Sequence, residues 1–213
     1  MRLGLFVLLL TTMATRATAV RRVLCLHGSG GSGASFLERL APLKTALGDE
    51  FEFTALDGPG GKWWTYPAGE RSFSASSYTG AEESIAAVEA ELAKGYTGLL
   101  GFSQGAMLAA LVAARCSLKE SEVSLKFAVI CGAATPAPYD ALLARSREAT
   151  EAVALPTLHC LSKADTMNPP ELGEALAGCF RHPPAQLLWH SIGHQLPPNE
   201  ELPKVVAFME QNA

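Results

Sequence analysis

The sequence predicts an α/β fold, a single domain with a mostly parallel sheet of about six strands and helices on both faces. Short apolar runs alternate with segments of helical periodicity from residue 21 onward. Several of these runs are apolar throughout, as in strands covered on both sides. The 213 residues are 48% hydrophobic and 18% charged, a composition that suits one sizeable core.

Each element is expected from its local pattern. Strands are predicted over residues 23–27, 51–56, 97–102, 125–131, 156–161 and 186–190, where apolar and β-forming residues cluster. Helices are predicted over residues 34–47, 80–94, from 104 onward, 139–147, from 169 or 170 to 177, and 200–211. Residues 57–79 form a long irregular stretch rich in glycine, serine and aromatics.

The first 19 residues differ from the rest. A basic start, an apolar run over residues 3–10 and Ala-Thr-Ala at residues 17–19 form the three-part layout of a secretory signal peptide. The hydroxyl residues and the absence of any acid before Glu38 also fit an organelle transit peptide. We therefore expect a leader over residues 1–19 and the folded domain over residues 20–213. The first leader implies the secretory pathway or secretion, the second an organelle.

Charge, hydropathy and cysteine content exclude several classes of function. A net charge of −4 without a basic cluster argues against a nucleic-acid partner. No apolar run reaches the ~18 residues of a transmembrane helix, so no stable membrane insertion is expected. Cys25, Cys131 and Cys160 fall in predicted strands, and Cys116 and Cys179 lie at helix ends, where an exported protein could pair them. Their spacing fits no metal site or disulfide framework, and inert thiols are expected.

The central motif is G-x-S-x-G at Gly101, Ser103 and Gly105, between a predicted strand and the helix that begins near Gln104. A serine on so tight a turn adopts a strained backbone, and its hydroxyl projects above the sheet edge. The flanking glycines avoid collisions with the neighbouring strand and helix. The helix N-terminus offers N–H groups to a developing oxyanion. Ser103 is therefore predicted to be a nucleophile, and the domain to have an α/β-hydrolase fold.

A serine nucleophile needs a base and an orienting carboxylate, and in α/β-hydrolases they follow in the order Ser, Asp or Glu, His. Asp165 follows the strand over 156–161, and His194 follows the strand over 186–190, which places both at the edge that displays Ser103. The alternatives are a turn cap for Asp165 and a loop hydrogen bond for His194. His190 is a rival base at a strand end, whereas His159 in mid-strand is expected to be a satisfied core residue. The order predicts the triad Ser103, Asp165 and His194.

The glycine-rich loop after the first strand supports two hypotheses. In the first, the N–H groups of Ser29 and Gln104 form an oxyanion hole, and His27 fixes the loop. In the second, residues 28–33 spell the G-x-G-x-x-G of a dinucleotide-binding oxidoreductase, with Asp57 closing the next strand. The second hypothesis leaves the serine motif and the triad order as coincidences. We therefore prefer the first, with no cofactor and no metal.

Residues 57–79 carry an unusual number of aromatic side chains: Trp63, Trp64, Tyr66, Phe73 and Tyr78. They could simply pack this segment onto the domain. They could also form an apolar wall above Ser103, in which case Trp63, Trp64 and Tyr66 would bind the acyl part of an ester or thioester.

Several motifs together resemble one known family. They are L-C-L-H-G at 24–28, L-D-G-P at 56–59, the tryptophan pair, G-F-S-Q-G at 101–105, L-P-T-L-H at 155–159 with Asp165, and G-H at 193–194 with Pro197. The combination resembles the FSH family of serine hydrolases, which includes ovarian-tumour-suppressor-candidate-like hydrolases and fungal polyketide thioesterases. The resemblance covers about residue 23 to the C-terminus. The carboxylesterase and acyl-protein thioesterase group shares G-F-S-Q-G and is the alternative.

The resemblance implies a compact, cofactor-free esterase or thioesterase with Ser103 as nucleophile, Asp165 as acid and His194 as base. Family members are usually cytosolic and begin almost at the first strand, so the leader here is an addition. The expected function is hydrolysis of a small-molecule acyl ester or thioester through an acyl-enzyme. A non-catalytic binding protein on the same scaffold is the alternative from another class, and the complete triad argues against it.

Overall fold

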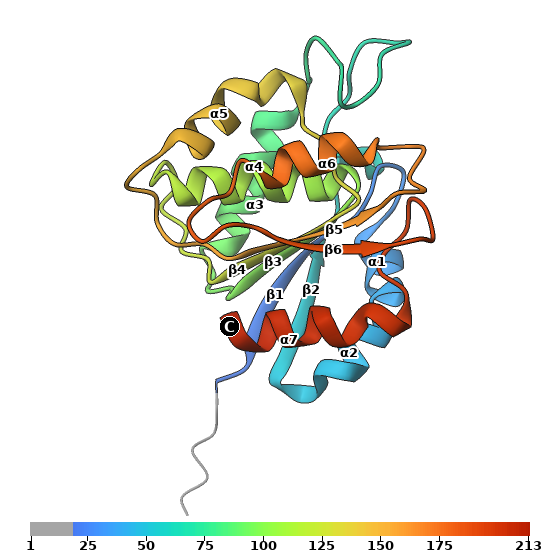
Figure 1. Cartoon of the computed structure of the whole chain (residues 1–213), viewed down its shortest axis with the longest axis vertical. Helices are drawn as coiled ribbons and strands as arrows, with labels where there is room; N and C mark the ends of the chain where they lie inside the picture. The colour runs from blue at the N-terminus through green and yellow to red at the C-terminus, as the bar shows by residue number, and fades with distance from the viewer. Residues whose placement is uncertain (1–18) are drawn as a thin grey trace, which may run out of the picture.

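The computed structural model of the chain describes residues 19–213. The leader predicted for residues 1–19 therefore lies outside the described residues except for Ala19. The described chain forms one domain around a central sheet (Figure 1). Between residues 19 and 213, no helix combines the length and the apolar character needed to cross a membrane.

The sheet has six strands in the order β2-β1-β3-β4-β5-β6, and all of its pairings are parallel, which confirms the predicted fold class. The strands are β1 (Arg21–Leu26), β2 (Phe51–Leu56), β3 (Gly98–Phe102), β4 (Phe127–Cys131), β5 (Thr157–Ser162) and β6 (Gln186–His190). The three strands β3, β4 and β5 are buried at every position, which explains their continuous apolar sequences. Because the strands are parallel, their carboxyl ends gather at one edge, where such sheets bind ligands.

Helices cover both faces of the sheet (Figure 1). One face carries α3 (Ala81–Leu92), α4 (Gln104–Ser117), α5 (Asp140–Glu148) and α6 (Pro170–Ala177). The other carries α1 (Gly33–Arg39), α2 (Ala41–Leu47) and α7 (Leu202–Asn212). Two clusters of buried side chains fill the space between the sheet and these two layers. Residues 57–79, hereafter the aromatic loop, connect β2 to α3 and project beyond the helical layer.

The helix predicted over residues 34–47 is in fact two helices, and this prediction was wrong. The helix α1 ends at Arg39, and α2 begins at Ala41 with Pro42 in its first turn. A continuous helix would place Pro42 in its interior, where the missing N–H and the ring disrupt the preceding turn. The break at Leu40 moves Pro42 to a position where a helix tolerates proline. The other elements agree with their predicted ranges to within two residues.

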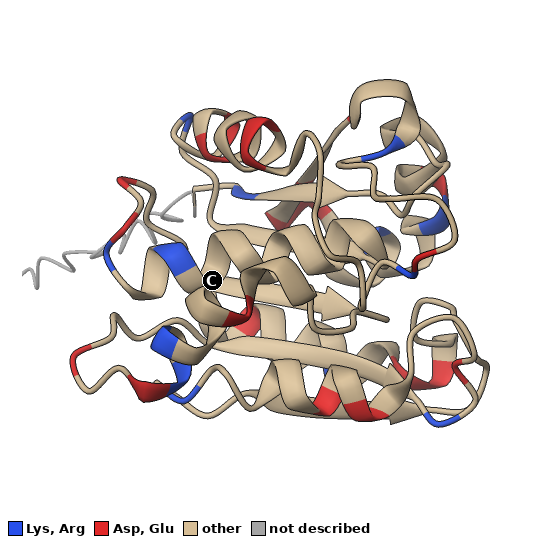
Figure 2. Cartoon of the chain, turned by 90° about the horizontal axis from the view of Figure 1, so that it is seen from above, with Lys and Arg blue, Asp and Glu red and all other residues tan. Residues whose placement is uncertain are grey.

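Charged side chains lie mostly on the surface of the domain, and the cysteines are buried and unpaired. In the part of the chain that the structure describes, positive and negative side chains are scattered among one another over the helices and loops (Figure 2). The central strands β3, β4 and β5 contain none of them. All five cysteines are buried free thiols, so Cys116 and Cys179 do not form a disulfide.

Candidate active site

Ser103 lies at the junction of β3 and α4 with φ 55° and ψ −121°. Few side-chain-bearing residues adopt such a backbone, and holding it costs about 1–3 kcal/mol. The close packing of the turn explains both flanking glycines. A Cβ on Gly101 would lie 2.4 Å from the carbonyl oxygen of Gly105, and a Cβ on Gly105 would lie 2.3 Å from that of Leu26. The sequence motif thus forms the sharp strand-to-helix turn that was predicted.

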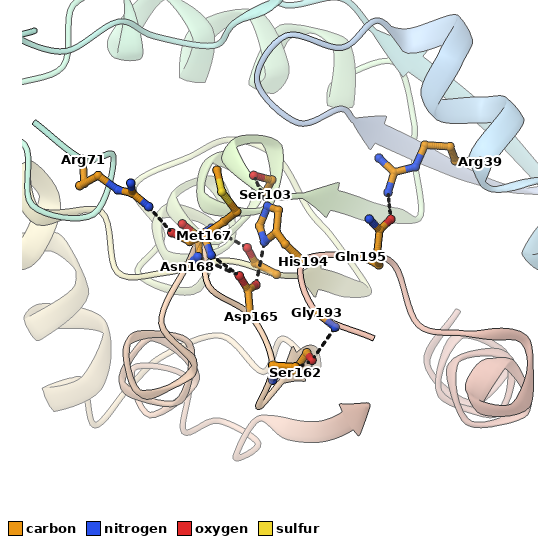
Figure 3. Close-up of polar contacts among 12 residues, drawn as sticks. Arg39, Arg71, Ser103, Ser162, Asp165, Met167, Asn168, Gly193, His194 and Gln195 are labelled. Carbon is orange, nitrogen blue, oxygen red and sulfur yellow. Dashed lines mark hydrogen bonds and ion pairs between the residues drawn. The ribbon is translucent and has the colours of Figure 1, made fainter. Parts of the chain in front are cut away.

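The imidazole of His194 joins the serine hydroxyl to a carboxylate (Figure 3). Its Nε2 atom lies 2.8 Å from Oγ of Ser103, and its Nδ1 atom lies 2.7 Å from Oδ2 of Asp165. The three side chains come from the loops that follow β3, β5 and β6, at the carboxyl edge of the sheet. The structure therefore brings together the three residues predicted as nucleophile, base and acid, in the order of contacts that nucleophile activation requires.

The carboxylate of Asp165 is held by its own loop. Its Oδ1 atom accepts hydrogen bonds from the backbone N–H groups of Met167 (2.8 Å) and Asn168 (2.9 Å). The side-chain amide of Asn168 in turn donates to the carbonyl of Gly132 at 2.7 Å. One carboxylate oxygen thus fixes the loop, and the other faces His194.

Ser162, the last residue of β5, connects the loop of the acid to the loop of the base. Its Oγ atom accepts hydrogen bonds from the N–H groups of Ala164 (3.2 Å) and Gly193 (3.0 Å) (Figure 3). Sequence reasoning missed Ser162 and Asn168. The signal was the spacing Ser-x-x-Asp-x-x-Asn, because serine and aspartate side chains often accept from N–H groups two or three residues further on.

Ser29 and Gln104, the predicted oxyanion-hole residues, both line the cavity beside Ser103. Gln104 is the first residue of α4, so its N–H has no acceptor within the helix. On the β1 side, the N–H of Gly30 donates to Gly61 and that of Gly31 to Gly28, whereas the N–H of Ser29 donates to no other described residue. Neither N–H group therefore has an acceptor among residues 19–213.

The cavity over Ser103 has a volume of about 610 Å³. Its walls come from the loop after β1, the helix α1, the aromatic loop and the loop that carries Asp165. Tyr66 lies in this lining and is 39% exposed, whereas Trp63 and Trp64 are absent from it. Of the three aromatic residues predicted to bind substrate, the structure brings only Tyr66 to the cavity.

The indole rings of Trp63 and Trp64 are buried in the core instead. The Nε1 of Trp63 donates to the carbonyl of His27 at 2.7 Å, and the ring of Trp64 stacks on Tyr78 with centroids 4.7 Å apart. The side-chain oxygen of Gln104 accepts the backbone N–H of Trp63, and its side-chain NH₂ donates to the backbone carbonyl of Trp64, both at 3.0 Å. The two tryptophans therefore pack the aromatic loop onto the domain, which was the alternative explanation. The prediction that Trp63 and Trp64 bind substrate was wrong.

The residues of the glycine-rich loop do not fit a dinucleotide. The Oδ1 atom of Asp57 accepts the N–H of Gly33 at 2.7 Å, so this carboxylate covers the start of α1, where a pyrophosphate would lie. The Nε2 atom of His27 accepts the N–H of Gly58 at 3.0 Å, which gives His27 the loop-fixing position expected of it. Across residues 19–213, no group of three or more His, Cys, Asp or Glu side chains is arranged to hold a metal ion.

The two other buried histidines lie outside the triad. His190, at the end of β6, is buried enough that its pKa is lowered from the usual range. His159, in the middle of β5, is fully buried, and burial lowers its pKa to about 3. Neither ring nitrogen of His159 has a hydrogen-bond partner among the described residues, so it is a core residue as predicted but not a satisfied one.

The chain is similar to known proteins in sequence and in fold. A sequence model of the family described as "Serine hydrolase (FSH1)" matches residues 17–62 and 60–205. The zebrafish (Danio rerio) protein named esterase OVCA2 is 31% identical, with 83% of this chain and 90% of that protein covered. The human esterase OVCA2 is also 31% identical, with 83% and 89% covered.

Two solved structures share the fold. Esterase PE8 superimposes with a TM-score of 0.71 at 23% identity, over 92% of this chain and 94% of that one. The acyl-protein thioesterase 2 of Zea mays superimposes with a TM-score of 0.70 at 21% identity, over 92% and 95%. The chain is thus a hydrolase with an α/β-hydrolase fold and, as its motifs indicated, it belongs to the FSH1 family of serine hydrolases.

Proposed function

We propose that this enzyme hydrolyses carboxylic esters or thioesters of small acyl substrates through an acyl-enzyme on Ser103. The observation that carries the proposal is the unbroken series of hydrogen bonds from Ser103 through His194 to Asp165, in which Ser103 and His194 line the cavity. A nucleophile, a base within reach and a carboxylate that orients the base are the parts that acyl transfer needs.

The reaction proceeds in two steps. His194 takes the proton from Oγ of Ser103 as the oxygen attacks the acyl carbonyl, and the N–H groups of Ser29 and Gln104 stabilise the oxyanion. The tetrahedral intermediate collapses when His194 gives the proton to the departing alcohol or thiol. Water then enters, and His194 takes a proton from it as it attacks the acyl-enzyme. The second tetrahedral intermediate collapses to the free acid as His194 returns the proton to Oγ of Ser103.

Part of the cavity wall is apolar and would fit an acyl chain. Apolar side chains from four segments line the cavity beside Ser103: Tyr66, Phe73, Phe102, Met107 and Met167. Of the three aromatic residues predicted to bind the acyl part, Tyr66 is the one that lines this wall, and we propose that it contacts the substrate. Trp63 and Trp64 contribute indirectly, because they anchor the aromatic loop that forms this wall.

The test is hydrolysis of p-nitrophenyl esters from acetyl to palmitoyl by the full chain and by its Ser103→Ala variant. We expect the variant to lose at least about 1,000-fold in kcat, because removing the nucleophile leaves only binding and the oxyanion hole. A fluorophosphonate probe should label Ser103 in the unmodified chain. The matched control is Ser77→Ala, at an exposed serine of the aromatic loop.

The optimum in chain length would show how much apolar chain the cavity takes. Equal activity of the chain and its Ser103→Ala variant would disprove the role of Ser103. Inactivity toward the whole series, together with no labelling by the probe, would disprove the proposed hydrolysis.

A further inference from the structure

Two arginines line the cavity without a carboxylate partner among residues 19–213. The structure describes eight arginines, and five of them form ion pairs with glutamates: Arg21, Arg22, Arg115, Arg145 and Arg147. Arg39 and Arg71 form none with the described residues, yet both lie in the wall of the cavity. They approach from opposite sides of Ser103 and His194 (Figure 3).

Arg39, the last residue of α1, is fixed next to the triad. Its guanidinium carbon lies 4.4 Å from the centroid of the Phe102 ring, and Phe102 precedes Ser103 in the chain. One of its N–H groups donates to the side-chain oxygen of Gln195 at 3.4 Å, and Gln195 follows His194. An amide oxygen and an aromatic face orient the guanidinium, but neither neutralises its charge.

Arg71, in the aromatic loop, is oriented in a similar way. Its Nη2 atom donates to the backbone carbonyl of Met167 at 3.3 Å, in the loop that carries Asp165. Glu70 is the one carboxylate in the cavity lining among the described residues. It accepts from the N–H of Ser76 at 2.7 Å and from its hydroxyl at 3.1 Å, so it is engaged within its own loop. The lining therefore presents two positive groups and one negative group that is already hydrogen-bonded.

We infer that the substrate carries a carboxylate or a phosphate, and that Arg39 and Arg71 bind such groups on the two sides of the scissile bond. A guanidinium has a planar fork of donors that matches both anions, and pairing with an anion would supply the charge that its present partners lack. Because Ser103 lies between the two arginines, an anion in the acyl part would meet one of them, and an anion in the leaving group would meet the other. The inference rests on the proposed function, since it assigns the substrate class of the same site.

Two matched pairs of substrates test the inference. Mono-p-nitrophenyl glutarate and p-nitrophenyl pentanoate share a five-carbon acyl chain and a leaving group, and differ in a terminal carboxylate. Butyryl-4′-phosphopantetheine and butyryl-pantetheine share an acyl group and the pantetheine thiol, and differ in the phosphate of the leaving group. We expect kcat/KM for the charged member to exceed that for the neutral member about tenfold or more in at least one pair, given the strength of charge-assisted hydrogen bonds. The pair that shows the preference distinguishes a carboxylate in the acyl part from a phosphate in the leaving group.

Substitution of the arginines assigns each of them. The charged-to-neutral ratio for the preferred pair should fall about tenfold in Arg39→Gln or in Arg71→Gln, and Lys at the same position should restore part of it because the charge returns. The ratio is internal to each variant, so a partial loss of folded protein cancels. Arg147→Gln, on α5 and outside the cavity, should leave the ratio as in the unmodified chain.

The failures are distinguishable. Ratios near or below one in both pairs, with hydrolysis of the neutral members that depends on Ser103, would overturn the inference and leave the proposed function intact. A preference that survives the double substitution Arg39→Gln, Arg71→Gln would also overturn it. If none of the four substrates is hydrolysed and the fluorophosphonate probe does not label Ser103, the proposed function and the inference fail together.

Discussion

The two carboxylate oxygens of Asp165 have different partners, and this difference allows its effect on the base to be separated from its effect on the loop. In Asp165→Asn, the side-chain oxygen can still accept the N–H groups of Met167 and Asn168. The amide NH₂ then faces Nδ1 of His194 and donates where the carboxylate accepted, which favours the wrong tautomer of the base. We expect kcat to fall by about 10³–10⁴-fold with little change in the melting temperature, measured by ester hydrolysis and thermal unfolding.

The matched control is Asp140→Asn, at the first residue of α5 and outside the cavity lining. It changes the same chemical group and should leave kcat within about twofold, because it has no contact with the triad. If Asp165→Asn kept more than a tenth of the activity, the carboxylate would not be the group that orients His194.

Ser162 offers a second test at the scale of single residues. Ser162→Ala removes the acceptor of two N–H groups, those of Ala164 and Gly193, which belong to the loops of the acid and the base. We expect a loss of about 1–3 kcal/mol in the free energy of unfolding, because the freed N–H groups lose their partner. We also expect a lower kcat, because Asp165 and His194 are then held less firmly relative to one another.

Ser146→Ala is the control for this prediction. Ser146 lies on α5, away from the triad, and is also buried. Its hydroxyl donates to the carbonyl of Cys179 at 3.0 Å. Chemical denaturation and ester hydrolysis of both variants should show comparable losses of stability, with loss of kcat in Ser162→Ala alone. Equal kcat values in the two variants would show that the hydroxyl of Ser162 does not position the site.

At the scale of secondary-structure elements, the junction of β3 and α4 depends on how closely the helix approaches the strand. In Gly101→Ala the new methyl group would lie 2.4 Å from the carbonyl oxygen of Gly105 and 2.6 Å from Cα of Ala106. Both neighbours are backbone of α4, which is buried along nearly its whole length and cannot shift alone. We expect destabilisation of more than about 4 kcal/mol or no folded protein, measured by urea denaturation and by soluble yield.

Gly95→Ala separates this packing effect from backbone strain. Gly95 has a φ of 90°, but a Cβ placed on it would meet no atom within 4 Å. Its substitution should cost only about 1–2 kcal/mol, which is the usual penalty for a side chain in a left-handed conformation. Similar stabilities of the two variants would mean that α4 can move away from β3.

The same elements show which features a sequence can predict. The serine turn, Asp165 and His194 each follow directly from a strand end, so the order of strands along the chain was enough to place them at one edge. The sequence could not decide between packing and substrate contact for Trp63 and Trp64, because their position depends on Gln104 and His27, which come from distant elements. The break between α1 and α2 is predictable from Pro42, because proline is tolerated in the first turn of a helix and disrupts the interior of one.

At the scale of the whole molecule, the cavity is assembled from segments that only the completed fold brings together. Arg39 comes from the end of α1, Arg71 from the aromatic loop, and Asn168 from the loop after β5. No local pattern links these segments, so the sequence predicted the reactive groups but not the arginines around them. The positions of the reactive groups follow from the order of the strands. The proposed preference for anionic substrates depends on segments from both faces of the sheet, which come together around the cavity.

Stability against acid is also a property of the whole molecule, because His159 lies at the middle of the sheet. The folded state holds this histidine at a pKa of about 3, whereas an unfolded chain has its ordinary value of about 6.5. Between these two values the unfolded state binds one more proton than the folded state. The free energy of unfolding therefore falls as the pH falls through this window, by up to about 1.4 kcal/mol per pH unit.

His159→Leu should remove this dependence, because leucine takes no proton and leaves no unpaired ring nitrogens in the core. From pH 7 to pH 5 we expect the unmodified chain to lose about 2 kcal/mol relative to the variant, measured by urea denaturation across the range. The burial-lowered pKa of His190 acts in the same direction in both proteins and cancels in the difference. His182→Gln, at a histidine with an exposed hydrogen bond, should behave as the unmodified chain does. Parallel stability curves for the chain and His159→Leu would show that His159 takes up a proton without unfolding.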